Sequence, residues 1–241
     1  MYDAWELLGR IDAHPYALIT GLAIAMLFQT VWMVAAIRVA RRDQAYSVPL
    51  SCTFLWFAHD LGFVVRLGEW SNRYDHWFLY LFWLGMLSAA LLELVFFAQI
   101  VRYGRQELAA VLTAGQFRAV IAAAVVGTII AWEYLRSLVG DPLYMASSAL
   151  TLMSFALFGP ALYLRRGGPR GQNLVMWVSF TAMTFTWWLT TASYLPSAFR
   201  SPQCLAVGGF SFVVGVVMSA VFVRHRQREA SEATLVPAAL R

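Results

Sequence analysis

The chain contains no lysine, because all 18 of its basic residues are arginine. A Schiff base requires a side-chain amine, so retinal cannot be held here as it is in the seven-helix retinal proteins. Cysteine is scarce as well. Cys52 and Cys204 stand near opposite ends of two predicted helices, too far apart for a disulfide, and neither has a His or Cys at metal-ligand spacing. Imine chemistry, a disulfide scaffold and a cysteine metal site are therefore excluded.

Charge is also scarce, at 13% of residues against 60% hydrophobic residues and a mean hydropathy of +0.62. This is more apolar surface than a soluble core of 241 residues can hide. A membrane-spanning helix needs about 20 mostly apolar residues. Seven stretches qualify, at 17–37, 48–67, 77–101, 119–138, 143–164, 174–195 and 204–223. The sequence predicts an all-α, seven-transmembrane-helix bundle in residues 1–230 and a flexible tail at 231–241.

Arginine follows every second predicted helix, and cytoplasmic loops collect positive charge. These arginines are Arg38, Arg41, Arg42, Arg102, Arg105, Arg118, Arg165, Arg166, Arg170, Arg224, Arg226 and Arg228. The opposite connections are near neutral or acidic, so we expect the N-terminus outside and the C-terminus inside. The asymmetry explains the pI of 9.5 without a nucleic-acid partner. Near the start, Trp5, Leu8 and Ile11 are expected on a helix at the membrane interface.

Three acids lie inside predicted spans, where a carboxylate is costly and usually faces the bundle interior. By the 1.5 Å rise per residue, Asp60 lies ~4 Å and Glu133 ~7 Å toward the outer side of the membrane, and Glu93 lies ~6 Å toward the cytoplasm. We therefore expect Asp60 and Glu133 to share a cavity, with Glu93 about two turns deeper. Asp60 is the most central of the three and has no basic neighbour at helical spacing.

Aromatic and aliphatic side chains surround Asp60 on its own helical face, at Trp56, Phe57, Phe63 and Val64. Poor solvation there disfavours the anion, and a protonated acid can give its proton away. Aromatic rings also attract cations. Further candidates for stabilising a cation are Trp132, Trp187, Trp188 and Tyr194. His59 adjoins Asp60 in sequence, so the two side chains should point about 100° apart and not form a simple dyad.

Structural roles remain open for several of these residues. His59 can be a hydrogen-bonded packing residue, and Glu93 can tie helices together by hydrogen bonds. Glu133 can pair with Arg136 one turn further on. Most of the aromatic residues suit membrane interfaces and lipid-facing surfaces in any case.

Three short segments stand in an order that a known family shares. They are Pro49-Leu50 with Trp-Phe-Ala-His-Asp at 56–60, Leu-Glu-Leu at 92–94 with Val-Arg-Tyr-Gly-Arg at 101–105, and Arg-Arg-Gly at 165–167 with Arg-Gly-Gln-Asn-Leu at 170–174. Together they resemble the membrane-integrated terpene cyclases of fungal meroterpenoid and indole-diterpene pathways, and their bacterial relatives in drimane-type indole alkaloid pathways. The last segment is the most specific.

The resemblance implies that Asp60 takes the place of the family's catalytic acid, within its Asn-x-x-Trp-Glu segment. The chain departs from that segment with Asp at 60, His at 59 and Trp at 56. The fungal enzymes carry a second catalytic Asp on the seventh helix, where this chain has Gly215 and no acid in 204–223. Glu133 or Glu93 is our hypothesis for the missing partner.

By this resemblance the protein is a terpene cyclase that protonates the terminal alkene or epoxide of a prenylated, farnesylated aromatic or indole substrate. Carbocation cyclisation would then give a drimane-type ring system. The implied enzyme needs no cofactor, and the chain has no Asp-Asp-x-x-Asp cluster to hold magnesium against a diphosphate. A lipophilic substrate would enter from the membrane lipid. The all-arginine, alanine-rich composition favours a bacterial plasma membrane protein.

Two other functions remain open. Acids inside three helices can relay protons in a proton-coupled small-molecule transporter, although such proteins usually show internal repeats or broken helices. A helix bundle with few polar groups can also be a structural or sensory protein. That interpretation leaves Asp60 unexplained.

Overall fold

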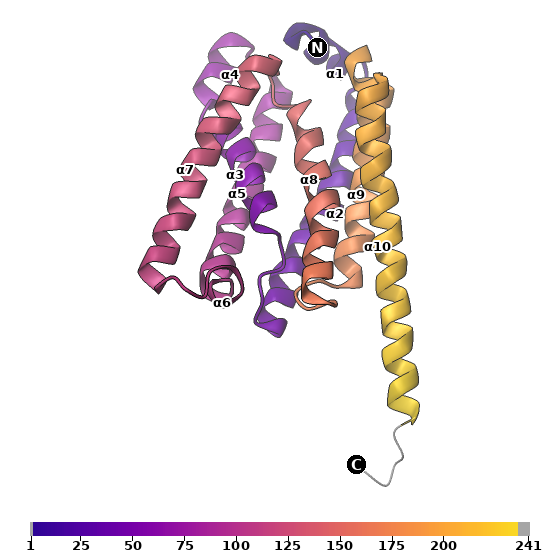
Figure 1. Cartoon of the computed structure of the whole chain (residues 1–241). Coiled ribbons are helices and arrows are strands. Elements are labelled where there is room, and N and C mark those ends of the chain that lie inside the picture. Colours follow the sequence, from indigo (N-terminus) through magenta and orange to yellow (C-terminus); the bar gives the residue numbers. More distant parts are fainter. Residues whose placement is uncertain (1, 236–241) are drawn as a thin grey trace.

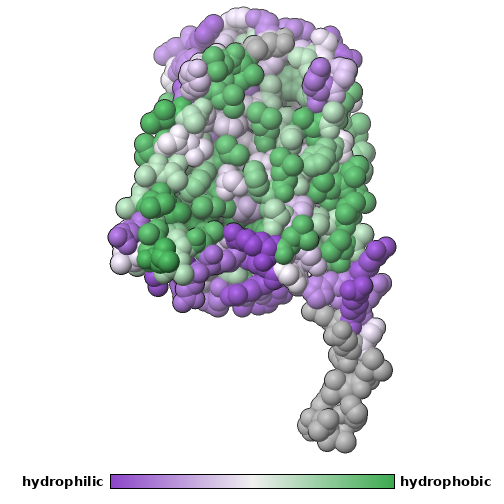
Figure 2. All heavy atoms as spheres, viewed as in Figure 1, coloured by the Kyte–Doolittle hydropathy of each residue, from purple (hydrophilic) through white to green (hydrophobic). Residues whose placement is uncertain are grey.

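The structure, a computed structural model, describes residues 2–235, and these contain helices and no β-strand. Five helices are long and apolar enough to cross a membrane: α2 (Pro15–Asp43), α5 (Trp77–Tyr103), α7 (Ala114–Val139), α8 (Ser147–Arg166) and α10 (Pro202–Leu235). A sixth candidate is the bent pair of α3 (Leu50–Val64) and α4 (Leu67–Arg73). Figure 2 shows a hydrophobic band between two hydrophilic ends. The chain is an all-α integral membrane protein.

Each of the seven predicted ranges holds a long helix. The helix not yet mentioned is α9 (Leu174–Tyr194), which fills the range predicted at 174–195. α9 is not among the five candidate spans, although its sequence contains no charged residue. The helices run side by side (Figure 1). α1 (Ala4–Ala13) and α4 lie at one end of the bundle, which we call the α1 end. α6 (Arg105–Leu108) lies at the other, which we call the α6 end.

The range predicted as one straight helix at 48–67 is broken after Val64, and α4 continues at 45° to α3. Side chains bond the carbonyls near this break. Arg66 Nη1 donates to Gly62 O at 2.6 Å, and Trp70 Nε1 donates to Phe63 O at 3.0 Å. A helix can end inside a packed bundle when its freed carbonyls are bonded in this way.

The α1 helix begins at the cap Asp3, whose carboxylate accepts from the backbone N–H groups of Trp5 and Glu6. Leu8 and Ile11 are buried in the core, whereas Trp5 is 58% exposed. A helix therefore forms where the interfacial helix was expected, but most of its apolar face packs against the bundle. Tyr2 joins this end to the segment before α8, because its hydroxyl donates to Asp141 Oδ1 at 2.5 Å.

Close packing of the long helices uses small residues. α3 packs against α5, α7 and α8, while α2 packs against α9, and α10 against α8 and α9. A Cβ atom on Gly21 of α2 would lie 2.1 Å from Thr190 Oγ1 of α9, so only glycine fits there. This arrangement leaves one cavity among α2, α3, α5, α8 and α9.

An ion-pair cluster closes the α6 end. Glu107 of α6 accepts from Arg165 and from Arg166 Nη2, the latter at 2.8 Å, and Tyr46 donates to it at 3.1 Å. Burial raises the pKa of Glu107, but hydrogen bonds and charges from Arg166 and Arg165 outweigh burial and hold that pKa below its ordinary value of 4.5.

The last helix is longer than predicted. α10 continues to Leu235, which is beyond the expected span at 204–223 and five residues into the segment expected as a flexible tail at 231–241. Residues 236–241 lie outside the described part of the chain.

Candidate functional site

A narrow cavity of about 100 Å³ lies inside the bundle. Four methionines and five aromatic residues give it an apolar wall: Met26, Met33, Met86, Met183, Trp32, Trp56, Phe82, Phe180 and Trp187. Three titratable side chains also face it, namely His59, Asp60 and Glu93. Only Asp60, His59, Glu93, Trp56 and Trp187 of these lining residues were candidates from the sequence. No sequence signal separates the methionines here from ordinary core residues.

One edge of the cavity lies near the lipid-facing surface. Met26 of α2 lines the cavity and is 36% exposed. Its methyl group lies over Gly85 of α5, where an added Cβ would come within 2.6 Å of Met26 Cε. A flexible methionine, rather than packed helix backbone, therefore separates the cavity from lipid between α2 and α5.

His59 and Asp60 form a direct contact, with 2.6 Å between His59 Nδ1 and Asp60 Oδ1. The expectation that they would not form a dyad is wrong. Adjacent side chains do diverge on a helix, but the imidazole is long enough to turn its Nδ1 back toward the neighbouring carboxyl group. Both residues are buried, at 1% and 6% exposure. The other carboxyl oxygen of Asp60 makes no hydrogen bond within residues 2–235.

The partner of the second imidazole nitrogen determines where the protons are. His59 Nε2 lies 3.0 Å from the backbone carbonyl oxygen of Tyr144 and 3.2 Å from Ser148 Oγ. The carbonyl can only accept, and Ser148 gives its own hydrogen to that carbonyl at 2.9 Å, so Nε2 carries a hydrogen. The short contact to Asp60 then needs a second proton. Either the acid form of Asp60 donates to a neutral His59, or a charged His59 donates to the carboxylate. In both cases the pair holds one proton next to the cavity.

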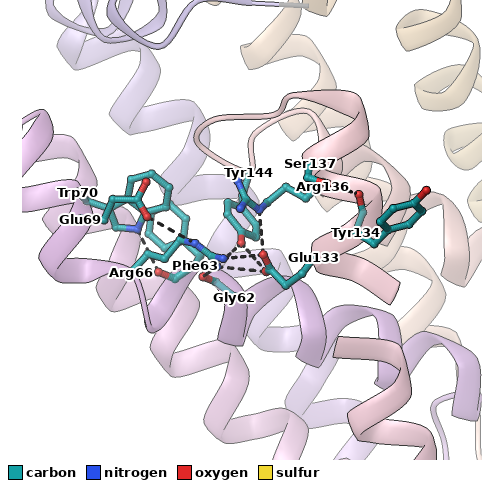
Figure 3. A network of polar contacts seen from close by, with 10 residues as sticks. All are labelled: Gly62, Phe63, Arg66, Glu69, Trp70, Glu133, Tyr134, Arg136, Ser137 and Tyr144. Atoms are coloured by element: carbon teal, nitrogen blue, oxygen red, sulfur yellow. Dashed lines mark hydrogen bonds and ion pairs between the residues drawn. The ribbon is translucent and has the colours of Figure 1, made fainter. Parts of the chain in front are cut away.

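Tyr144 is held in place by an ion-pair network near the α1 end (Figure 3). Its backbone has φ +59°, a left-handed conformation that is uncommon for a non-glycine residue. Its hydroxyl donates to Glu133 Oε1 at 2.8 Å and accepts from Arg66 Nη1 at 2.6 Å. The side chain thus fixes the backbone carbonyl that bonds His59. Neither Tyr144 nor Arg66 was a candidate from the sequence, because their partners are distant along the chain.

Glu133 belongs to this network and not to the cavity, so the expectation that it shares a cavity with Asp60 is wrong. Arg66 Nη2 and Arg136 Nε contact Glu133 Oε2 at 2.6 and 3.2 Å, and the Arg136 pair confirms the structural role left open above. Depth along a helix places a residue at a level in the membrane. It does not say which side of the helix faces which neighbour, and here two arginines and a tyrosine take up the carboxylate.

Glu93 does share the cavity with Asp60. It is 1% exposed and makes no hydrogen bond with any described residue. The alternative that Glu93 ties helices together by hydrogen bonds therefore receives no support from its contacts. Trp32 is similar, since it lines the cavity and its indole N–H has no partner in the same part of the chain.

Two of the predicted cation-stabilising aromatics line the cavity. Trp56 is fixed there by donating to Thr151 O at 2.7 Å and to Ser154 Oγ at 3.0 Å. Trp187 is the second. The other five candidates do not line it: Phe57, Phe63, Trp132, Trp188 and Tyr194. Of these, Trp132 packs edge-on against His59 with 5.7 Å between ring centroids, so it supports the pair from behind.

The described residues contain no group of three metal-ligating side chains. The chemistry available at the site is thus that of a buried acid with a bonded imidazole, an unpartnered second acid and a wall of aromatic and thioether groups. Comparison with protein-family profiles, with curated proteins and with solved structures found no match.

Proposed function

We propose that the protein is a membrane-bound terpene cyclase that starts its reaction by protonating the terminal alkene of a prenylated substrate, with an epoxide as the alternative starting group. The observation that carries the proposal is the 2.6 Å contact between His59 Nδ1 and Asp60 Oδ1 at the wall of an apolar, aromatic cavity. The backbone carbonyl of Tyr144 supports the proposal, because it accepts the hydrogen of His59 Nε2. The proton between His59 and Asp60 is then the one available for transfer.

In the proposed reaction, Asp60 gives the proton that it shares with His59 to the terminal alkene, which leaves a carboxylate beside a neutral imidazole. The alkene electron pair forms the new C–H bond and leaves a tertiary carbocation. Neighbouring alkenes of the folded chain then attack in turn, and each attack forms one C–C bond and moves the positive charge along. Loss of a proton to the His59–Asp60 pair ends the reaction and restores the pair. No metal or redox partner is consumed.

The wall of the cavity suits a carbocation. Trp32, Trp56 and Trp187 present aromatic rings, which attract cations most strongly when water is excluded. Early loss of the cation to water is also suppressed in an apolar cavity. Trp56 is held in place by its two hydrogen bonds, so its ring position does not depend on the substrate.

The cavity must widen to take a farnesyl chain, since about 100 Å³ is below the roughly 300–1,000 Å³ typical of ligand pockets. The four methionines make this possible, because their unbranched thioether chains change rotamer at little cost. Met26 lies at the lipid edge and is the proposed point of entry. The substrate class is a farnesylated aromatic or indole compound, and the product is a drimane-type ring system.

We further propose that the membrane is crossed seven times. The α3–α4 pair and α9 then add two spans to the five long apolar helices. The arginine-rich α6 end then faces the cytoplasm and the α1 end faces outside. The membrane is a bacterial plasma membrane. The resemblance to membrane-integrated terpene cyclases supports the same arrangement, although α10 has no acid in 204–223 to match the second catalytic Asp of the fungal enzymes.

A proton-coupled transporter is the second candidate. It is favoured by the two acids, Asp60 and Glu93, that face one cavity inside a membrane protein. In that case the break between α3 and α4 would be part of a gate.

The test uses membranes containing the full chain, incubated with a farnesylated indole and analysed for cyclised product. Asp60→Asn should remove the product, and Asp12→Asn, the same change at an exposed rim position, should retain it. Equal product from both variants would exclude Asp60 as the donor. If no product forms with any variant, but substrate addition drives proton flux into proteoliposomes, the transporter replaces the cyclase.

A further inference from the structure

Two buried polar groups face the cavity with no hydrogen-bond partner in residues 2–235. Glu93 is 1% exposed and its Oε2 atom is unpartnered, and Trp32 is 2% exposed with an unpartnered indole N–H. A buried polar group left without a partner costs about 1–3 kcal/mol, so most such groups in proteins are bonded. Two of them in one cavity call for an explanation.

The Trp32 ring lies close to the part of α5 that carries Glu93. It is enclosed by edge contacts to Trp56, Phe96 and Phe155, with centroid distances of 5.2, 6.0 and 4.9 Å. Phe96 follows Glu93 by three residues and so shares its face of α5. Trp32 therefore packs beside the turn of α5 that carries Glu93.

Most other polar side chains at the cavity wall are bonded to other described residues, the exceptions being Gln29, which is only partly buried, and the second carboxyl oxygen of Asp60. Trp56, Ser148 and Thr151 donate to backbone carbonyls, and His59 bonds both Asp60 and Tyr144. Other unpartnered groups, such as the Trp188 N–H, do not line the cavity. Among the fully buried side-chain atoms of the cavity wall in residues 2–235, those without a partner are thus Glu93 Oε2 and the Trp32 indole nitrogen.

We propose that Glu93 and Trp32 form a subsite that binds a hydroxyl group at the polar end of the substrate. The indole N–H only donates, so it needs an acceptor on the ligand, and the Glu93 carboxyl accepts from a donor. A hydroxyl supplies both at one atom. An indole N–H would satisfy only Glu93, and a hydrocarbon would satisfy neither.

This inference rests on the proposed function, because it assigns a place to the polar end of the same prenylated substrate. The reacting alkene lies at Asp60 and the hydroxyl at Glu93, on the wall of one cavity. The substrate class is thereby narrowed to prenyl compounds that carry a free hydroxyl, with the methionines in contact with the chain between the two ends.

The test compares three probes that share a farnesyl-type hydrocarbon chain: farnesol, its methyl ether and farnesene. Binding is measured for the purified full-length protein in lipid nanodiscs, by the rise in Tm as each probe is titrated. We expect farnesol to bind at least about tenfold more tightly than farnesene, with the ether in between, since each bond made is worth up to about tenfold in affinity.

Trp32→Phe keeps the ring and removes the N–H, so it should reduce the preference for farnesol about tenfold. Trp188→Phe is the matched control, because it removes another buried and unpartnered indole N–H, from a residue that does not line the cavity, and it should leave the preference unchanged. If Trp32→Phe does not fold, the comparison of the three probes on the unchanged protein still decides the matter.

Equal affinities for the three probes on the unchanged protein would overturn the subsite and would indicate that water occupies it. Failure of the proposed function looks different. A preference for farnesol in a protein that forms no cyclised product would retain the subsite and exclude the cyclase. Asp60→Asn should abolish product and still bind farnesol with the same preference.

Discussion

Replacing Glu133 by glutamine should slow the proposed reaction although Glu133 does not touch the cavity. The carboxylate binds Arg66, Arg136 and the hydroxyl of Tyr144, and Tyr144 in turn presents its backbone carbonyl to His59. Glutamine keeps the shape and removes the charge. Tyr144 then loses one of the contacts that hold its left-handed backbone, and the carbonyl moves away from His59 Nε2.

Two magnitudes follow from the geometry. The side chains of Arg66, Arg136 and Glu133 are 22–28% exposed. Breaking an exposed ion pair costs about 0–1 kcal/mol of stability and breaking a buried one about 3–5 kcal/mol, so we expect a value between these for the Glu133 pairs. A loss of about 2 kcal/mol corresponds to a fall in Tm of about 4–8 °C. Losing a hydrogen bond to His59 worth about 1 kcal/mol corresponds to about a fivefold lower kcat.

Glu107→Gln is the matched control, because Glu107 also binds two arginines and a tyrosine, but at the α6 end. Both variants should lose Tm by similar amounts, measured in nanodiscs by intrinsic fluorescence. Only Glu133→Gln should lose kcat. Equal kcat losses in the two variants, or none in either, would refute the argument that the Arg66–Glu133 network positions His59 through Tyr144.

Three further predictions concern packing and charge. Gly21→Ala should lower Tm, because its Cβ would overlap Thr190, whereas Gly127→Ala, with open space around it, should leave Tm unchanged or raise it slightly. Trp56→Phe removes one indole N–H, which is shared between Thr151 O and Ser154 Oγ and is worth about 1 kcal/mol, so Tm should fall by roughly 2–4 °C with the aromatic surface retained. The lowered pKa of Glu107 means that its carboxylate stabilises the fold fully above its ordinary pKa of 4.5 and loses this effect as pH falls through the lowered value. The Tm difference between the unchanged protein and Glu107→Gln should therefore be constant above that pH and shrink in acid; a difference that grows in acid would contradict the ion pair.

The sequence predicts the helices well because length and hydropathy alone decide where a lipid-embedded chain must be helical. Each of the seven expected ranges holds a long helix. The bend after Val64 was missed because it depends on Arg66 and Trp70, whose side chains bond the carbonyls of a broken helix only in the folded arrangement. The late start of α8 at Ser147 depends similarly on Tyr2, which bonds Asp141 from the other end of the described chain.

The candidate site is predictable only in part. Asp60 and Glu93 follow from the cost of acids in a membrane, and both face the cavity. Glu133 satisfies the same argument and does not face it, since its surroundings are set by Arg66 and Tyr144 from other helices and loops. The sequence did not single out Trp32, and the reason is again physical. An aromatic residue on an apolar helix is common, and its unpartnered N–H becomes apparent only when the surrounding helices are in place.

A proton that Asp60 donates to carbon can be followed by deuterium incorporation from the solvent. Membranes containing the protein are incubated in D₂O with a farnesylated substrate that ends in an alkene, and the product is examined by mass spectrometry and NMR. We expect one non-exchangeable deuterium on the carbon that was the CH of the terminal alkene, and none after Asp60→Asn. A cyclised product without deuterium at that carbon, or with the same deuterium after Asp60→Asn, would contradict the proposal that Asp60 is the donor.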